Sequence, residues 1–179
     1  MTLNELIIQC KKQDAAAQGE LYNRYNKILF AICLRYSPNY IEAEDNLQDA
    51  FITIFKKIEQ YNGKGSFEGW MKRITVNTAL QKYRKKRPFE IVDESQIEED
   101  ASVEIENEEI PLDFLLKIVQ ELPDRYRLVF SMYVMDGYQH KEIAKMLRIS
   151  DGTSKSNLAR ARTILKNKIE AYNAKDHNA

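Results

Sequence analysis

Residues 122 to 165, LPDRYRLVFSMYVMDGYQHKEIAKMLRISDGTSKSNLARARTIL, constrain the fold more than any other part of the chain. Their apolar residues recur at helical spacing in two segments that are separated by a short break. In the first segment, three residues share one face of the helix, namely Ile143, Ala144 and Leu147. The break at 148–151 ends this helix, and either Ser150 or Asp151 can cap the start of the next one. The segment therefore predicts two short-linked helices that cross closely at a small alanine.

The second of these helices divides into an apolar face and a basic face. Its inward positions are Leu158, Ala161 and Leu165. The positions expected to project elsewhere are Lys155, Asn157, Arg160 and Arg162. This division is typical of a helix-turn-helix, in which the second helix reads the major groove of DNA. The alternative is an ordinary amphipathic pair of helices with a solvated basic face.

The net charge of zero conceals three blocks of opposite sign. Residues 1–88 carry 15 basic and 9 acidic side chains, whereas residues 114–179 carry 12 basic and 7 acidic ones. Between them, residues 89–113 carry 11 acidic side chains and no basic ones. Two basic regions indicate a polyanionic partner. The segment 89–111 is too acidic and too poor in large apolar residues to fold alone, so it is expected to be a flexible linker.

Helical periodicity also dominates the rest of the chain, and no segment shows sustained strand alternation. The expected helices are 3–12, 15–36, 41–61, 67–87, 112–121 and 123 to about 135, besides the helix-turn-helix. In the helix 15–36 the expected inward residues are Leu21, Tyr25, Ile28, Leu29, Ile32 and Tyr36. We therefore expect an all-α fold of two small bundles, with domains at 1–88 and 112–175 joined by the linker.

Several functional classes are disfavoured by composition. His140 and His177 are the only histidines, and neither belongs to a cluster with metal-ligand spacing, so we expect no metal site, cofactor or enzymatic activity. Cys10 and Cys33 each lie in an amphipathic pattern, which favours buried thiols over a disulfide. The chain has no apolar run of membrane-spanning length and no signal-like start, so we expect a cytoplasmic protein without a small-molecule substrate.

The helix 67–87 becomes strongly basic toward its end. Its cations are Lys72, Arg73, Lys82, Arg84, Lys85, Lys86 and Arg87, interleaved with Trp70, Asn77 and Tyr83. Cations beside amides and rings suit a surface that touches phosphates and bases. The alternative for 82–87 is a solvated helix end that complements the helix dipole. For Trp70, packing beside Ile74 is favoured over base stacking, whereas for Tyr61 the two readings stay open.

Three motifs in this order carry a resemblance that spans nearly the whole chain. They are AEDNLQDAFITIFKKI (43–58), YNGKGSFEGWMKRITVNTALQKYRKK (61–86) and the helix-turn-helix with its LPDRYRLVF approach. Together, split by an acidic linker, they resemble an extracytoplasmic-function (ECF) sigma factor of the sigma-70 superfamily. The resemblance implies a bacterial initiation factor that recruits core RNA polymerase to promoters and assists strand opening. It leaves open whether an anti-sigma factor binds this chain.

The resemblance also implies roles for individual residues. The motif matched by Asp45, Leu47, Gln48, Asp49 and Phe51 docks on a coiled coil of the polymerase. Its alternative is a core helix with acidic solvent positions. Residues that match the downstream (−10) promoter surface, on the loop 61–66 and the helix after it, are Tyr61, Asn62, Lys64, Lys72, Arg73, Asn77, Lys82, Arg84 and Lys85. Residues that match the upstream (−35) element reader are Lys155, Ser156, Asn157, Ala159 and Arg160.

Two positions depart from the family pattern. Arg148 stands where the turn usually has glycine, so a left-handed backbone there would carry roughly 1 kcal/mol of strain. Ser154 stands where an aliphatic residue is usual, and its hydroxyl needs a partner, such as a carbonyl one turn back.

Two rival functions remain. A stand-alone helix-turn-helix regulator explains residues 122–165. It assigns no function to the helical motif 43–58 or to the basic helix 67–87. An interaction protein, such as an anti-sigma factor or adaptor, fits poorly with two basic domains.

Overall fold

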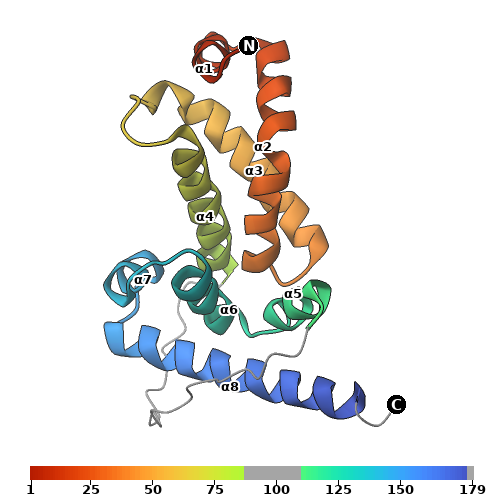
Figure 1. Cartoon of the computed structure of the whole chain (residues 1–179). Helices are drawn as coiled ribbons and strands as arrows, with labels where there is room; N and C mark the ends of the chain where they lie inside the picture. Colours follow the sequence, from red (N-terminus) through yellow and green to blue (C-terminus); the bar gives the residue numbers. More distant parts are fainter. Residues whose placement is uncertain (87–109, 177–179) are drawn as a thin grey trace. The chain divides into compact units, whose positions relative to one another are not determined.

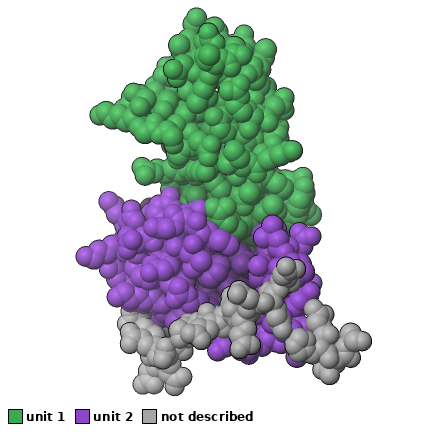
Figure 2. All heavy atoms as spheres, in the orientation of Figure 1, with its two compact units in different colours: residues 1–82 green, residues 83–179 purple. Residues whose placement is uncertain are grey.

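The structure is a computed structural model that describes residues 1–86 and 110–176. Within these ranges every regular element is helical (Figure 1), so the predicted all-α fold class is confirmed. The predicted acidic linker, 89–111, lies almost entirely outside the described residues. The chain divides into two compact units, Met1–Lys82 (unit 1) and Tyr83–Ala179 (unit 2), which Figure 2 colours separately. Sequence analysis places the end of the first domain at residue 88.

Unit 1 is built from the first four α-helices of the chain. These are α1 (Leu3–Lys11), α2 (Ala15–Tyr36), α3 (Tyr40–Lys57) with its one-turn extension η1 (Ile58–Gln60), and most of α4 (Phe67–Lys86), whose last four residues belong to unit 2. The starts of α2 and α3 follow from local capping. Asp14 accepts a hydrogen bond from the amide of Ala17 at 2.7 Å, and Asn39 accepts one from Glu42 at 2.9 Å. Such side-chain caps satisfy amides that lack a helical partner, which fixes where each helix begins.

The core of unit 1 follows the predicted helical faces with one exception on α2. The inward stripe of α2 contains Leu21, Tyr25, Leu29, Ile32 and Tyr36, all buried. Ile28 was expected inside but is exposed. It precedes Leu29 by one residue and so lies about 100° away around the helix. The predicted apolar face of α2 was therefore too wide.

Both cysteines are part of this core. Cys10 on α1 and Cys33 on α2 are free thiols and fully buried, which confirms the interpretation of each as a small buried hydrophobic residue. Burial raises the pKa of the Cys33 thiol to about 12. A thiol with so high a pKa stays protonated and unreactive at neutral pH.

Unit 2 contains the helix-turn-helix and the helices that support it. Its elements are α5 (Leu112–Gln120), α6 (Asp124–Phe130) with a π-helical turn η2 (Ser131–Met135), α7 (His140–Leu147) and α8 (Asp151–Asp176). The helix predicted from 123 to about 135 is therefore an α-helix that ends in a π-turn. One buried cluster of this unit joins α5, α6 and α8 through Ile118, Val119, Leu122, Tyr126, Ala161 and Leu165.

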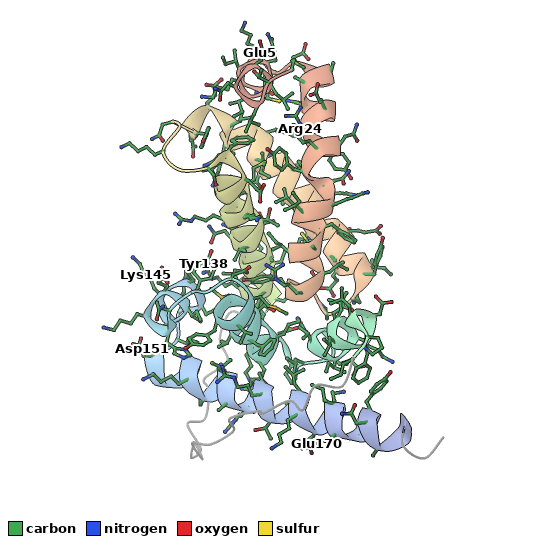
Figure 3. All side chains as sticks on the ribbon, viewed as in Figure 1. Glu5, Arg24, Tyr138, Lys145, Asp151 and Glu170 are labelled. Carbon is green, nitrogen blue, oxygen red and sulfur yellow. The ribbon has the colours of Figure 1, made fainter. Side chains whose placement is uncertain are left out.

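The long helix α8 serves two parts of unit 2. Figure 3 shows Asp151 and Glu170 near its opposite ends. The first half packs against α7 and α6, and the second half packs against α5. There the rings of Phe114 and Tyr172 stack with centroids 4.1 Å apart, and Lys168 bonds Glu121 at 2.6 Å. Helix α5 and the residue after it therefore support the second half of α8.

A buried arginine closes the junction between α5 and α6. Arg127 is only 2% exposed, and its guanidinium donates to the carbonyls of Gln120 at 3.1 Å and Leu122 at 2.7 Å. Its other terminal nitrogen pairs with the carboxylate of Asp124. Arg127 thus satisfies carbonyls at the C-terminal end of α5, which have no partner within that helix.

Candidate nucleic-acid interfaces

The turn between α7 and α8 has the geometry that the sequence predicts. Ile143, Ala144 and Leu147 are buried on the inward face of α7. Arg148 then takes a left-handed backbone, with φ 59° and ψ 45°, and its amide donates to the carbonyl of Ala144. A side chain in this region carries about 1–2 kcal/mol of strain, because its Cβ crowds the next carbonyl. The expected left-handed turn at a non-glycine residue is confirmed.

Ser150 caps the second helix. Its hydroxyl oxygen accepts a hydrogen bond from the amide of Thr153 at 3.0 Å, and Asp151 is the first helical residue. Of the two candidates open from the sequence, Ser150 therefore makes the cap, while Asp151 places a negative charge in the first turn.

Ser154 finds its partner across the turn instead of one turn back along its own helix. Its hydroxyl lies 2.9 Å from Nδ1 of His140, at the start of α7, and the two share a hydrogen bond. The imidazole also stacks on Tyr133, with ring centroids 4.4 Å apart. The predicted carbonyl partner for Ser154 is thus wrong. The structural reason is that α7 brings an imidazole into the buried crossing of the two helices.

The His140 contact predicts a pH dependence. Burial, followed by the positive charge of Lys155, lowers the pKa of His140 below its ordinary value of 6.5, although Asp151 opposes the shift. The folded protein therefore favours the neutral ring. Below pH 6.5 the unfolded chain binds the proton first, so stability present above that pH is lost as pH falls through the folded pKa. We expect the unfolding free energy to fall between pH 7.5 and 5.5, and His140→Asn to flatten that slope. Equal slopes in the two proteins would contradict this account.

The solvent-facing stripe of α8 carries most of the upstream-element candidates. Lys155 is exposed, whereas Ser156 and Ala159 are half-buried. Positions 155, 156 and 159 lie on one side of a helix, so they can meet one groove together. Asn157, in contrast, is 3% exposed. Its projection toward DNA was wrongly predicted, because it falls on the same stripe as the buried Ser154 and Ala161.

Arg160 is already engaged within unit 2. Its guanidinium donates to the hydroxyl of Tyr126 at 3.3 Å. Burial raises the pKa of Tyr126, but the hydrogen bond from Arg160 and the charge of Arg125 together outweigh this effect. The pKa of Tyr126 therefore lies below its ordinary value. Arg160 therefore lies at the flank of the exposed stripe and ties α8 to α6.

Helix α3 separates the candidate docking residues into buried and exposed groups. Asp45 and Gln48 are exposed, whereas Leu47 and Phe51 belong to the core. Phe51 packs on Tyr22 of α2, with ring centroids 4.7 Å apart. The two apolar members of the predicted docking motif, Leu47 and Phe51, therefore face the core of unit 1. They lie on the inward stripe of α3 and hold the helix in place.

Asp49 connects two surfaces that sequence analysis treats separately. Its carboxylate pairs with the ammonium of Lys82 on α4 at 2.9 Å, and both side chains are partly exposed. The structure thus brings a candidate polymerase contact together with a candidate DNA contact. Because exposed ion pairs contribute little stability, the pair orients these side chains more than it stabilises unit 1.

The loop 61–66 is held by contacts at each end. The Tyr61 hydroxyl donates to the carbonyl of Gly65 at 2.8 Å, and the Asn62 side chain accepts from the amide of Lys64 at 3.1 Å. Gly63 and Gly65 have φ near +79° and +77°, which glycine adopts without a Cβ clash. Asn62 and Lys64 are exposed and Tyr61 is half-buried.

The candidate residues of α4 differ in exposure, and only some of them share one side of the helix. Trp70, Arg73, Asn77 and Arg84 share one side of the helix by their spacing. Arg73, Asn77 and Lys85 are exposed, whereas Trp70, Ile74 and Arg84 are half-buried. Lys72 pairs with Glu68 at 2.6 Å, one turn away on α4. The stripe therefore offers a ring, a guanidinium and an amide along one line.

Comparison with known proteins identifies the family. The Sigma-70 region 2 model matches residues 21–89, and the Sigma-70, region 4 model matches residues 114–165. The ECF RNA polymerase sigma factor SigW of Bacillus subtilis (strain 168) is 30% identical, over 94% of this chain and 97% of that relative. The chain belongs to the ECF sigma factors.

Other relatives agree with this assignment. The ECF RNA polymerase sigma-E factor of Escherichia coli (strain K12) is 28% identical over 95% of both chains. The sigma factor RpoE from Bartonella quintana, solved in complex with the anti-sigma factor NepR, shares the fold. Its TM-score is 0.55 at 22% identity, over 85% of this chain and 96% of that one.

Membership of the ECF sigma factors confirms the predicted function. The protein is a transcription initiation factor whose partners are core RNA polymerase and promoter DNA, and its family is one of non-enzymatic transcription factors. A stand-alone helix-turn-helix regulator is not favoured, because the family match also covers residues 21–89. Among the described helices of this sigma factor, none is both long and apolar enough to span a membrane.

Sequence analysis of the sigma factor missed two exposed residues of α3. Ile41 is 72% exposed and Ile52 is 50% exposed, on the same side of the helix as Asp45 and Gln48. They are eleven residues apart, which is close to three helical turns. The sequence alone could have shown that these residues are exposed, because neither isoleucine follows the helical spacing of the core residues of α3.

Proposed function

We propose that unit 1 of this sigma factor docks on core RNA polymerase through the exposed side of α3. The observation that carries the proposal is the pairing of Ile41 and Ile52 with the polar Asp45 and Gln48 between them. An apolar contact with a polar rim is the usual anatomy of a protein interface. Asp49 lies at the edge of this surface, and Leu47 and Phe51 support it from the core.

The downstream promoter element is assigned to the loop 61–66 and the exposed side of α4. Arg73 and Lys64 offer charges to phosphates, and Asn77 offers an amide that can both donate to and accept from a base edge. Base capture would supply strand opening, since an unpaired base can be held by stacking and hydrogen bonds. Tyr61 shapes this surface, and Lys85 and Arg84 extend it along the helix.

The upstream element is assigned to α8 of unit 2. Lys155, Ser156 and Ala159 form the reading face, while Arg160 acts from its anchored position at the edge. Residues 89–111 would tether the two functional domains at 1–88 and 112–175. The activity is binding without nucleotide hydrolysis, in the cytoplasm where promoters lie. An anti-sigma partner is proposed by analogy with the complex in which the structural relative was solved.

Lys155→Ala tests the upstream assignment. If Lys155 contacts a base, its loss should weaken promoter-specific binding by about 1–3 kcal/mol and relax sequence preference at one position. Holoenzyme binding to promoter variants measures both effects. Lys175→Ala is the matched control, because Lys175 is also exposed on α8 but lies five to six turns away. Uniform weakening on all sequences would reduce Lys155 to a phosphate contact, and unchanged binding would remove it from the interface.

A further inference from the structure

We propose that Lys11 of α1 is a positioning residue for promoter opening, because it holds the start of the loop 61–66 in place. This inference rests on the proposed role of that loop at the downstream element. The Lys11 ammonium donates a hydrogen bond to the backbone carbonyl of Tyr61 at 2.9 Å, across fifty residues of sequence. The contact is partly buried, and α1 packs directly against η1 (Figure 1).

The chemistry of the contact suits a fixed anchor. Tyr61 is the C-terminal cap of η1, where the α3–η1 run ends. Carbonyls at a helix C-terminus lack helical partners and carry partial negative charge, so a lysine ammonium is a favoured donor there. The amide of Tyr61 meanwhile donates to the carbonyl of Ile58 at 3.1 Å. Both sides of the Tyr61 backbone are therefore held.

Tyr61 passes this restraint on to the loop. Its hydroxyl donates to the carbonyl of Gly65 at 2.8 Å, close to the far end of the loop. Its ring packs on Phe67 and Trp70, with centroids 4.9 and 5.6 Å away. Trp70 begins the exposed stripe of α4 that includes Asn77. A displacement of Tyr61 would therefore disturb the loop and the first turn of α4 together.

Helix α1 is a firm support for this contact. Thr2 and Glu5 form a reciprocal capping box at its start, at 3.3 and 2.8 Å. Its inward residues, which are buried against the rest of unit 1, are Leu6, Ile7 and Cys10. The sigma-70 region 2 match begins only at residue 21, so α1 lies before the part of the chain that this family model describes. We infer that α1 is an accessory brace of the promoter-opening surface.

Lys11→Met tests the inference, with Lys12→Met as the matched control. Lys12 is exposed beside Lys11, so its loss removes the same charge without removing the contact. Trp70 is the only tryptophan of the chain and lies in the ring cluster of Tyr61. Lys11→Met should therefore shift Trp70 emission and increase its quenching by acrylamide, whereas Lys12→Met should resemble the wild type. Lys11→Arg should restore the wild-type signal, because it keeps a cationic donor.

Promoter opening by the holoenzyme is the second readout. On duplex promoter, Lys11→Met should reduce permanganate-reactive open complex about three- to tenfold, the effect of losing one hydrogen bond of ordinary strength. On a template with a preformed bubble it should equal the wild type. Unchanged Trp70 signals, or equal changes in Lys12→Met, would overturn the role of Lys11. So would normal opening by Lys11→Met when Asn77→Ala is defective. If Asn77→Ala also opens promoters normally, the proposed role of the whole surface fails instead.

Discussion

Replacing Arg127 with methionine should lower the unfolding free energy of unit 2 by about 2–4 kcal/mol. Methionine retains much of the apolar volume but supplies no donor. The carbonyls of Gln120 and Leu122 would lose the guanidinium, and the carboxylate of Asp124 would lose its ion pair. A buried acceptor deprived of its donor keeps the full desolvation penalty, which explains the large expected effect.

Denaturant unfolding of the full chain, followed by two probes, measures this change. Trp70 fluorescence reports on unit 1, while circular dichroism reports on all helices. The dichroism of Arg127→Met should lose part of its amplitude at lower denaturant, and the Trp70 transition should stay in place. Arg125→Met is the control, because the guanidinium of Arg125 lies 5.0 Å from the ring centre of Tyr126 but, unlike that of Arg127, is not buried. A wild-type dichroism transition in Arg127→Met would contradict the assigned role.

Combining Ile41→Asp with Ile52→Asp should weaken binding to core RNA polymerase by about 2–4 kcal/mol, because apolar anchors at an interface centre carry most of its energy. Both side chains are exposed, so helix content and thermal stability should remain near wild type. Competition for core polymerase against a labelled wild-type chain measures the affinity.

The matched control for this pair is Ile8→Asp. Ile8 is 52% exposed on α1, comparable to Ile52, but it lies on another helix of unit 1. Its variant should compete as well as the wild type. Equal loss in Ile8→Asp would indicate a general effect of the introduced charge, and undiminished binding by the double variant would remove α3 from the docking surface.

Helix positions were predictable because their signals are local. Helix α2 begins and ends at the predicted residues 15 and 36, because Asp14 caps its start and Pro38 follows its end. Such features depend on a few neighbouring residues, so one sequence contains enough information to place them. The left-handed turn at Arg148, in contrast, was expected from the family resemblance, because the family usually has glycine at this position.

The side-chain partners were not predictable, because they depend on how helices pack. Ser154 meets His140 from another helix, Lys82 of α4 meets Asp49 of α3, and Lys11 reaches Tyr61. Helix phase was the other source of error. A shift of one residue turns a side chain by about 100°, which is enough to bury Asn157 and to expose Ile28.

Run-off transcription with purified core polymerase and promoter fragments tests the central claim most directly. The wild-type chain should convert core polymerase, which is inactive at these promoters alone, into an enzyme that starts at defined sites. The Ile41→Asp, Ile52→Asp variant should lose this activity at limiting concentration, while Ile8→Asp should retain it. A chain that protects promoter DNA without polymerase, favours a palindrome and supports no run-off product would contradict the assignment.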